Sequence, residues 1–407
     1  MHKEFRRIQV ILKIVERCNL ACSYCYYFEG GDQSYKDKPA VIGRSTAGEL
    51  AQFLRQGAID LGLDDVWVAF HGGEPMMIKP ALFDEICSTL GKALDGVCRL
   101  TLDLQTNGYH ITEEWLRLFD KHGVNVSVSI DGVGSTHDRF RKNHRGGGSY
   151  LKIKQNYIKM RDHLQAKGKG SPSVISVLSA KNNYRDQISG LYEELGIRRF
   201  NFLLPDCNHD DGIPDGFTAS DYGRILCEIF DEWAERTDIY VREIENVIIR
   251  FQLATQKESS RVQENSVRTW KCVENQIIVV RSDGELQIDD TFIPASDWRN
   301  SLTKRQLSDC SLKDYLGLSV FAEIDDLYSR RPEKCSSCVW GNICNGGDLE
   351  NRYSKENGFD NPSVYCDGLR MFYRKIARYL RTNGYPASLM RDRLTPTNDS
   401  HQHSYAR

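Results

Sequence analysis

The chain lacks several features that would place it in a large class of proteins. Its 407 residues contain no apolar run near the roughly 20 residues that a transmembrane helix needs. Its formal net charge is −2, and no long basic stripe indicates a nucleic-acid-binding surface. The N-terminal stretch MHKEFRRIQVILKIVE carries Lys13 and Glu16 and has no small-residue cleavage site, so it predicts a first strand and not a secretory signal. We therefore expect a cytoplasmic protein that binds neither nucleic acid nor a membrane.

Cysteine, in contrast, is abundant. The chain has 13 cysteines, and in a reducing compartment clustered thiols are more often metal ligands or catalysts than disulfides. A first group near the N-terminus consists of Cys18, Cys22 and Cys25. A second group, nearer the C-terminus, consists of Cys272, Cys335, Cys338, Cys344 and Cys366. The scattered ones are expected to be small buried hydrophobic residues: Cys87, Cys98, Cys207, Cys227 and Cys310.

Short β-branched runs alternate with helical patterns along the first half of the chain. Strands are expected at 8–15, 66–72, 100–108, 124–132, 173–180 and 199–206. Helices are expected between them, at 46–62, 80–94, 112–122, 150–167 and 184–195. This alternation predicts parallel strands with right-handed crossovers. Six repeats are too few for a full eight-stranded barrel, so we expect an α/β fold built as a partial (β/α)6 TIM-like barrel.

The length of the chain predicts more than one domain, since single cores stop growing at roughly 250–300 residues. We expect the barrel over 1–216, a helical bridge over 217–265, a small cysteine-rich domain over 266–370, and a C-terminal helix with a polar tail over 371–407. Five polar motifs lie at or just after the C-terminal ends of predicted strands: CNLACSYC, HGGEP, QTNG, SIDG and LLPD. Ligands of parallel α/β folds bind at that edge of the sheet.

The segment RCNLACSYC (17–25) has the cysteine spacing C-x3-C-x2-C. Zinc usually takes four ligands, and three thiols with no paired cysteines or histidine nearby are an incomplete set. For a [4Fe–4S] cluster the incomplete set is useful, because three irons bind cysteine and the fourth stays open for a substrate. With this spacing at the end of a first strand, the chain resembles the radical S-adenosylmethionine (radical SAM) enzymes, which implies that these cysteines hold the S-adenosylmethionine-binding cluster.

Further sequence motifs extend the resemblance and imply residues that contact S-adenosylmethionine. FHGGEP matches the segment that contacts the methionine amino group. There, Gly72 and Gly73 would let the backbone approach a ligand closely, and Glu74 would offer a carboxylate to an ammonium. SIDG resembles the family's ribose- and carboxylate-binding word, which gives that role to Ser129 and Asp131.

The same resemblance covers three more side chains. HDRFR resembles the family's HDxxR, whose arginine lies near the methionine carboxylate, a role that falls to Arg141. QTNG adds Asn107 as a polar contact, and Tyr24 corresponds to the aromatic residue beside the adenine. His71 and His209 receive no role. The family's chemistry implies that S-adenosylmethionine is cleaved to methionine and a 5′-deoxyadenosyl radical, with an external electron donor such as flavodoxin or ferredoxin.

The run CSSCVWGNICNGG places Cys335, Cys338 and Cys344 in a C-x2-C-x5-C pattern, and Cys366 follows in NPSVYC. Four thiols are a closed set, and spacing alone leaves zinc open. The run resembles the SPASM extension of peptide-modifying radical SAM enzymes. This resemblance implies that the four cysteines hold one auxiliary [4Fe–4S] cluster.

The chain also departs from the full SPASM pattern. Asp348 stands where another cysteine follows Cys344, and Gly284 leads to Asp289 where a further cysteine is expected. Of the ligands of a second auxiliary cluster, only Cys272 clearly remains. We therefore predict two clusters in total and not three.

Asp290 is the predicted catalytic residue. In the peptide-sulfatase maturases that share the SPASM pattern, an Asp at this position acts as a base. A carboxylate near the substrate could take the proton released when the substrate radical is oxidised. The alternative is a solvated turn carboxylate.

The stretch CNGGDLENRYSKENGFDNPSVYC (344–366) and the sixth predicted strand, FNFLLPDCNHDDG, resemble the cyclophane-forming (triceptide-type) maturases of ribosomally made peptides. This resemblance implies a precursor peptide with leader and core, in which an aromatic ring carbon is joined to a nearby β-carbon. Thioether formation, epimerisation and Ser or Cys oxidation are the alternative peptide reactions. A non-catalytic iron–sulfur electron carrier and a zinc-stabilised binding module are alternatives of another class.

Overall fold

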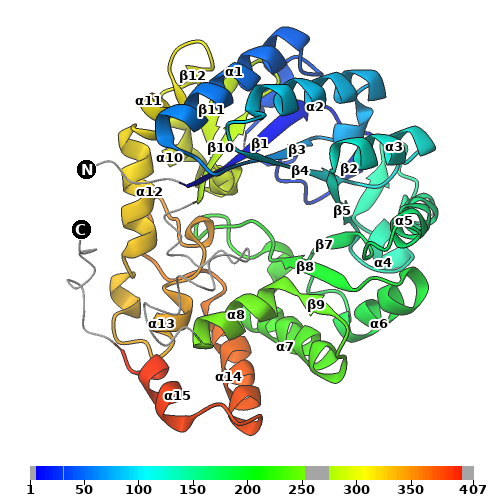
Figure 1. Ribbon diagram of the computed structural model, residues 1–407. Coiled ribbons are helices and arrows are strands. Elements are labelled where there is room, and N and C mark those ends of the chain that lie inside the picture. Colours follow the sequence, from blue (N-terminus) through cyan, green and yellow to red (C-terminus); the bar gives the residue numbers. More distant parts are fainter. Residues whose placement is uncertain (1–5, 31, 253–274, 397–407) are drawn as a thin grey trace. The chain divides into compact units, whose positions relative to one another are not determined.

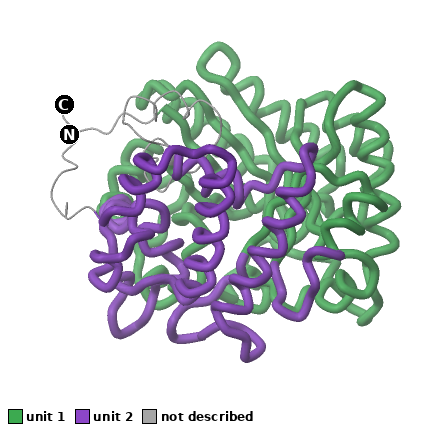
Figure 2. The backbone as a smooth tube through the Cα atoms, turned by 90° about the horizontal axis from the view of Figure 1, so that it is seen from below, with its two compact units in different colours: residues 1–177, 187–203, 273–322 green, residues 178–186, 204–272, 323–407 purple. Residues whose placement is uncertain are grey.

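The computed structural model describes residues 6–30, 32–252 and 275–396 (Figure 1), so Cys272 and the tail beyond 396 lie outside the described residues. The chain forms two compact units, coloured separately in Figure 2. Unit 1 comprises residues 1–177, 187–203 and 273–322, and unit 2 comprises residues 178–186, 204–272 and 323–407. No helix in the described ranges combines the length and the apolar character needed to cross a membrane.

The sheet of unit 1 contains all six predicted strands. They are β1 (Arg7–Val15), β3 (Asp65–Gly72), β4 (Arg99–Thr106), β5 (Asn125–Ser129), β7 (Ser173–Val177) and β8 (Arg199–Leu203). Each is parallel to the next in this order. The alternate residues Val10, Val68 and Phe70 are fully buried and the residues between them are half-buried, so one face of these strands is fully covered. The predicted α/β class with a parallel core is confirmed.

The connecting helices are also those predicted from the apolar spacing. They are α1 (Arg44–Leu61), α2 (Pro80–Leu94), α3 (Glu113–His122), α5 (Tyr150–Gln165) and α6 (Tyr184–Leu195). In Figure 1, α1, α2, α3 and α5 lie along the outer side of the sheet. α3 shows how the sequence sets the limits of a helix: Thr112 caps its first turn with its side chain, and Gly123 ends it in a left-handed conformation.

The sheet continues past β1 with strands from the second half of the chain. β10 (Asn275–Val280) is parallel to β1, and β11 (Glu285–Ile288) and β12 (Arg305–Gln306) follow in antiparallel order. The pairing of β10 with β1 accompanies the inclusion of residues 273–322 in unit 1, and the predicted boundary at 266 lies outside the described residues. The other elements of this part are η4 (Asp290–Ala295), α10 (Ser296–Asn300), α11 (Leu312–Leu316) and α12 (Ser319–Ser329), the last of which continues into unit 2.

Short elements complete the C-terminal edge of the parallel strands. β2 (Leu20–Cys22) pairs with β6 (Arg141–Asn143) in an antiparallel ribbon. Single turns follow three of the strands: η1 (Ser34–Asp37), η2 (Pro75–Met77) and α4 (Ser135–Asp138). The ribbon brings the first cysteine segment next to the HDRFR segment.

Unit 2 is built mainly on two helices, α7 (Ala219–Glu235) and α14 (Cys366–Thr382), which pack closely against each other. A Cβ at Gly223 would lie 2.5 Å from the Gly368 Cα, so these two glycines allow the helix backbones to touch. The remaining elements are η3 (Pro214–Gly216), β9 (Tyr240–Val241), α8 (Arg242–Gln252), η5 (Glu333–Cys335), α13 (Gly341–Cys344), η6 (Leu349–Asn351) and α15 (Ala387–Leu394).

Candidate functional site

The first cysteine group lies on the loop after β1. Cys22 ends β2 and is paired across the ribbon with Arg141. The Leu20 N–H donates to Cys18 Sγ at 3.4 Å, and Arg141 Nη1 lies 4.0 Å from Cys22 Sγ. All described cysteines are free thiols. The loop therefore presents Cys18, Cys22 and Cys25 as three unlinked, half-buried thiols.

These thiols fit a cluster that three cysteines hold. Burial raises the pKa of Cys18 to about 12 and that of Cys22 to about 11, and it also raises the pKa of Cys25. Such thiols are protonated alone and become thiolates when a metal binds, because coordination removes the proton. The N–H donors directed at two of the sulfurs stabilise the resulting negative charge. The ligand roles stay predictions.

Tyr24, Asp131 and Arg141 form one buried group beside Cys22. The Arg141 Nε donates to Asp131 Oδ2 at 2.8 Å, and the Tyr24 hydroxyl donates to the same oxygen. The Val177 N–H donates to the other carboxylate oxygen at 3.1 Å. The Arg141 guanidinium lies 5.4 Å from the centre of the Tyr24 ring. The structure thus brings three predicted contact residues together and pairs the Asp131 carboxylate with donors of the chain itself.

Glu74 connects the ends of β3 and β4. Its side chain is fully buried, and Oε1 accepts from Thr106 Oγ1 at 2.7 Å and from the Met76 N–H at 3.0 Å. Oε2 accepts from the Asn107 N–H at 2.7 Å. The Asn107 side-chain amide in turn lies 3.8 Å from Cys18 Sγ. Glu74 therefore positions Asn107 next to the cysteine loop, and contact of either residue with a ligand stays a prediction.

The two glycines of FHGGEP approach the protein backbone. A Cβ at Gly72 would lie 2.2 Å from the Val15 carbonyl oxygen, and a Cβ at Gly73 would lie 2.1 Å from the Arg17 carbonyl oxygen. Gly72 also has a φ of 120°, a conformation that side chains rarely adopt. The close approach seen here is made to the segment that leads into the cysteine loop, whereas we expected it for a ligand.

Three other positions that the sequence singled out each have a different environment. Ser129 ends β5 and accepts a hydrogen bond from Gln105 Nε2 at 2.8 Å. Asp289 caps η4 by accepting from the Thr291 N–H at 3.1 Å. Asp348 is exposed at the start of η6. For Asp289, a capping role explains the carboxylate without a metal.

The second cysteine group belongs to unit 2. Cys335 ends η5, Cys344 ends α13 and Cys366 begins α14. The Cys338 N–H donates to the Cys335 carbonyl at 3.1 Å, which closes the C-x2-C turn. Burial raises the pKa of Cys335 to about 11 and that of Cys344 to about 12. The donor chemistry fits a thiolate-bound cluster.

Within the described ranges, no three or more His, Cys, Asp or Glu side chains are grouped so that they could hold a metal ion. Each thiolate of a [4Fe–4S] cluster binds a different iron atom, so the cysteines need not converge on one point. The assignment of seven cysteines to two clusters stays a prediction.

Asp290 belongs to a buried polar group that we name the Lys13 cluster: Lys13, Tyr26, His71 and Asp290. Lys13 Nζ forms an ion pair with Asp290 Oδ2, and it lies 3.1 Å from His71 Nδ1 and 3.3 Å from the Tyr26 hydroxyl. The Tyr26 hydroxyl donates to Asp290 Oδ2 at 2.8 Å. Asp290 is 6% exposed, which excludes the solvated turn carboxylate that we kept as an alternative.

The Lys13 ammonium sets the protonation of the group. Burial alone would raise the pKa of Asp290, but the charge and hydrogen bond of Lys13 hold it well below its usual range. Burial, followed by the charge of Lys13, lowers the pKa of His71 to about 3. Asp290 is therefore ionised and His71 neutral near pH 7. Sequence reasoning missed Lys13, although a lysine inside the buried run QVILKIV is an available signal.

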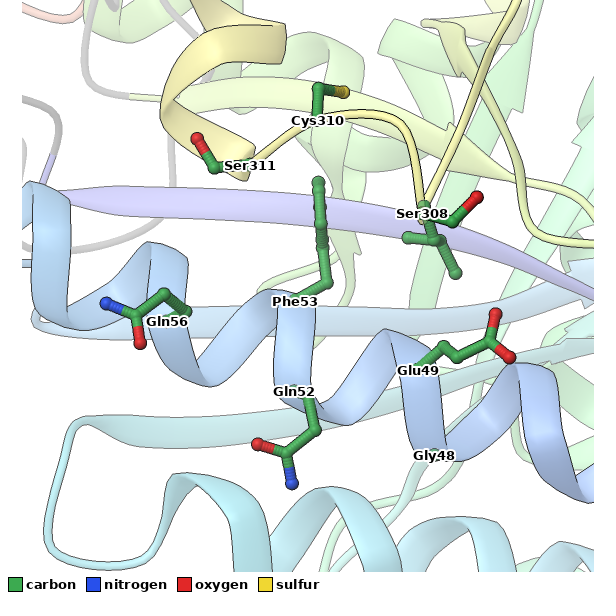
Figure 3. Close-up of a pocket in the computed structure, with 9 residues that line it drawn as sticks. Gly48, Glu49, Gln52, Phe53, Gln56, Ser308, Cys310 and Ser311 are labelled. Atoms are coloured by element: carbon green, nitrogen blue, oxygen red, sulfur yellow. The ribbon is translucent and has the colours of Figure 1, made fainter.

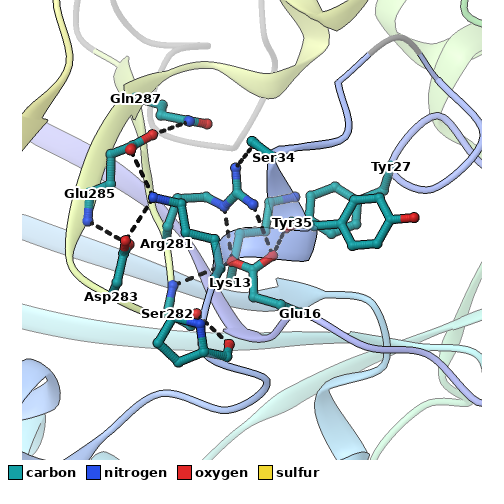
Figure 4. Close-up of polar contacts among 12 residues, drawn as sticks. Lys13, Glu16, Tyr27, Ser34, Tyr35, Arg281, Ser282, Asp283, Glu285 and Gln287 are labelled. Atoms are coloured by element: carbon teal, nitrogen blue, oxygen red, sulfur yellow. Dashed lines mark hydrogen bonds and ion pairs between the residues drawn. The ribbon is translucent and has the colours of Figure 1, made fainter.

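A second buried ion pair fixes the start of the cysteine loop (Figure 4). Arg281 donates to Glu16 from Nε at 2.9 Å and from Nη2 at 3.0 Å, and the Tyr27 hydroxyl also donates to Glu16. Glu16 and Arg281 are 0% and 2% exposed. The pair ties the residues before Cys18 to the turn between β10 and β11.

A separate groove lies on unit 1 between α1 and the segment before α11. It is lined by Gly48, Glu49, Gln52, Phe53, Gln56, Leu307, Ser308, Cys310 and Ser311. Figure 3 shows Phe53 pointing from α1 toward the segment of Cys310 and Ser311. None of the lining residues is a predicted site residue, and we assign the groove no function.

The part of the chain that carries the first cysteine group matches a family of known proteins. Residues 12–171 match the family model of the Radical SAM superfamily. The serine-type anaerobic sulfatase-maturating enzyme of Bacteroides thetaiotaomicron is 24% identical over 386 residues, which span 89% of this chain and 87% of that protein. The cysteine-type enzyme of Clostridium novyi is 22% identical over 371 residues, or 88% and 92% of the two chains.

A solved structure, native anSMEcpe with bound AdoMet and Cp18Cys peptide, has the same fold. The TM-score is 0.75 at 18% identity, and the match covers 93% of this chain and 98% of that one. The predicted radical SAM fold is confirmed. The relatives reported above are sulfatase-maturating enzymes, and the cyclophane-forming reaction stays a prediction.

Proposed function

We propose that this protein is a radical SAM enzyme that modifies a ribosomally made precursor peptide by joining an aromatic ring carbon to a nearby β-carbon. The observation that carries the proposal is the cysteine loop of residues 18–25, with Arg141 and Asn107 directed at its sulfurs, inside the segment that matches the superfamily. The cyclophane reaction is supported by the resemblance of residues 344–366.

A peptide substrate is supported by the similarity to the sulfatase-maturating enzymes over most of the chain. The anSMEcpe structure with the same fold holds both AdoMet and a peptide. We propose the same two ligand classes here, with an external donor such as flavodoxin or ferredoxin supplying electrons.

The residues have distinct proposed tasks. Cys18, Cys22 and Cys25 would hold one [4Fe–4S] cluster, and Cys335, Cys338, Cys344 and Cys366 would hold the auxiliary one. Bound together with S-adenosylmethionine, the first cluster would supply the radical chemistry that removes a β-hydrogen from the peptide. The resulting carbon radical adds to the ring, and the ring must then lose one electron and one proton to become aromatic again.

Asp290 is the proposed acceptor of that proton. It is ionised and buried, so its carboxylate is available without competition from water. The ion pair with Lys13 makes it a weak base. A weak base is sufficient, because a ring that regains aromaticity releases its proton readily.

Oxidation of a serine or cysteine is the second candidate reaction. It is favoured by one observation, namely that the curated relatives reported above are the serine-type and cysteine-type sulfatase-maturating enzymes. The same loop and the same Asp290 would serve both reactions.

The test uses the anaerobically purified protein with reconstituted iron and sulfide, S-adenosylmethionine, a reductant, and each short peptide encoded beside its gene. Released 5′-deoxyadenosine and the mass and fragmentation of each peptide are measured. The triple variant C18A/C22A/C25A is the control. We expect loss of two hydrogen atoms, fragmentation blocked between an aromatic residue and its neighbour, and no product from the control.

Chemical probes separate the other outcomes. Serine oxidation also removes two hydrogen atoms, but its aldehyde reacts with hydroxylamine. Thioether formation consumes a cysteine thiol, so this thiol no longer reacts with an alkylating reagent. Epimerisation in heavy water leaves one deuterium in the peptide. A protein that binds iron and releases no 5′-deoxyadenosine with any peptide would contradict the enzymatic proposal in favour of an electron carrier.

A further inference from the structure

We infer that Lys13 and His71 form the exit path for the proton that Asp290 takes from the substrate, and that His71 passes this proton to solvent. The inference rests on the proposed function, because it starts from a proton on Asp290. It assigns His71 a task that neither the motif pattern nor the comparisons give it.

The path is needed because Asp290 is enclosed. Asp290 is 6% exposed, and its Oδ2 is in contact with Lys13 Nζ and the Tyr26 hydroxyl. Lys13 is 1% exposed, so it cannot release a proton to water either. His71 lies on β3, its Nδ1 is 3.1 Å from Lys13 Nζ, and it is half-buried, whereas Lys13 and Asp290 are buried. The Asp290–Lys13–His71 chain thus leads from the enclosed carboxylate to the least enclosed residue of the three.

The hydrogen-bonding chemistry of Lys13 and Tyr26 determines the direction of proton transfer. A lysine ammonium has only donors, so His71 Nδ1 must accept from Lys13, and neutral His71 carries its proton on Nε2. The Tyr26 hydroxyl already donates its single hydrogen to Asp290 and is therefore oriented inward. Burial, followed by the charge of this ammonium, lowers the pKa of His71 and keeps the side chain neutral at rest. When Lys13 passes a proton to His71, its positive charge moves to the imidazole and no longer opposes the transfer.

The steps balance as follows. The substrate ring loses a C–H proton to Asp290 and one electron to the oxidant, an iron–sulfur cluster that the four cysteines of unit 2 are proposed to hold. Lys13 gives a proton to His71 Nδ1 and takes the proton of Asp290. His71 then releases its Nε2 proton to water, and exchange with water restores the original tautomer. At the end Lys13 is again a cation, Asp290 an anion and His71 neutral.

The charged groups that act on His71 are Lys13 from β1 and Asp290 from η4, and Tyr26, which follows the cysteine loop, contacts both of them. Lys13 Nζ also lies 4.7 Å from the centre of the Tyr27 ring. No other residue of the group needs to change its charge.

The experiment compares His71→Gln, His71→Gly and the wild type, all as full chains with reconstituted clusters, on the peptide that the wild type cross-links. Glutamine can still accept the bond from Lys13 but cannot pass a proton on. The readout is cross-linked peptide formed per 5′-deoxyadenosine released. His163→Gln is the matched control, because His163 is a partly exposed histidine paired with Asp120 on the outer helices.

We expect the ratio to fall about tenfold or more in both His71 variants, toward the roughly 10²–10⁴ that positioned proton-transfer groups contribute. Added imidazole should restore it in His71→Gly, while the wild type and His163→Gln stay unchanged. Iron content and 5′-deoxyadenosine release should match the wild type in every variant.

Each result decides between the two proposals. If the wild type releases 5′-deoxyadenosine and cross-links no peptide, the proposed function fails and the exit path fails with it. If the wild type cross-links its peptide and His71→Gln has the same ratio, only the exit path is overturned. If the ratio falls but imidazole does not restore it, His71 has a structural role and the exit path is likewise overturned.

Discussion

At the scale of single residues, the unusual feature is the burial of Lys13 and Glu16 in one short stretch of chain. Each has an opposite charge from the second half of the sequence, Asp290 and Arg281. Removing one partner of a buried pair leaves the other charge without compensation, which costs far more than breaking an exposed pair.

The replacement Arg281→Met tests the Glu16 pair. We expect it to lower the free energy of unfolding by about 3–5 kcal/mol, because Glu16 stays buried with its charge. Arg44→Gln is the control: in the Arg44–Glu85 pair the two side chains are 70% and 46% exposed, and its loss should cost about 0–1 kcal/mol. Denaturant unfolding under anaerobic conditions measures both, and equal effects would contradict the expectation.

The replacement His71→Gln tests the protonation of the Lys13 cluster. The pKa of His71 is about 3 in the folded chain, against about 6.5 unfolded. The unfolded state therefore binds more protons, so this contribution to stability is present above pH 6.5 and is lost as the pH falls toward 3. We expect the loss of stability between pH 7 and pH 4 to be smaller in the variant. Parallel pH profiles of the unfolding midpoint would count against a neutral His71 in the folded chain.

At the scale of elements, the sequence was sufficient where the pattern is local. The six parallel strands, the helices between them and the position of the cysteine loop all follow from apolar spacing and from motifs at strand ends. The run NQIIVV was not assigned to the sheet, because its partner is β1, which lies far away in the sequence. No local pattern carries that information.

Local sequence patterns also identify only part of the candidate site. Cysteine spacing identified the thiols, and HDRFR and SIDG identified Arg141 and Asp131, which the structure joins in an ion pair. Lys13, Glu16 and Arg281 were missed because a charged side chain ordinarily indicates a solvated face. Only the fold shows that every residue in the last part of β1, from Leu12 to Val15, is buried.

The contact between α7 and α14 gives a prediction for unit 2. A Cβ at Gly368 would lie 2.1 Å from the Ala219 carbonyl oxygen. We expect Gly368→Ala to cost about 1–3 kcal/mol, because two helix backbones must separate. Gly91→Ala in α2 has no atom within 4 Å of the new Cβ and should gain about 0.5–1 kcal/mol. Thermal unfolding distinguishes them, and a neutral Gly368→Ala would mean that the helices are less closely packed than described.

At the scale of the whole molecule, the two cysteine groups make a prediction about metal content. Two [4Fe–4S] clusters require about eight iron atoms per chain. The double variant C335A/C338A should retain about four, and C18A/C22A/C25A should retain the other four. Iron and sulfide analysis of anaerobically reconstituted protein measures this. About twelve iron atoms would instead indicate a third cluster that uses Cys272, Asp289 or Asp348.

The Glu16–Arg281 pair also affects when the chain can fold during its synthesis on the ribosome. The two residues are 265 positions apart. At the usual translation rate of about 5–20 residues per second, Arg281 is made roughly 13–50 s after Glu16. During this interval β1 has one open edge, and the nascent cysteine loop is without the anchor that fixes its first residues. We therefore expect the first cysteine loop to reach its final conformation only after β10 and Arg281 have been made.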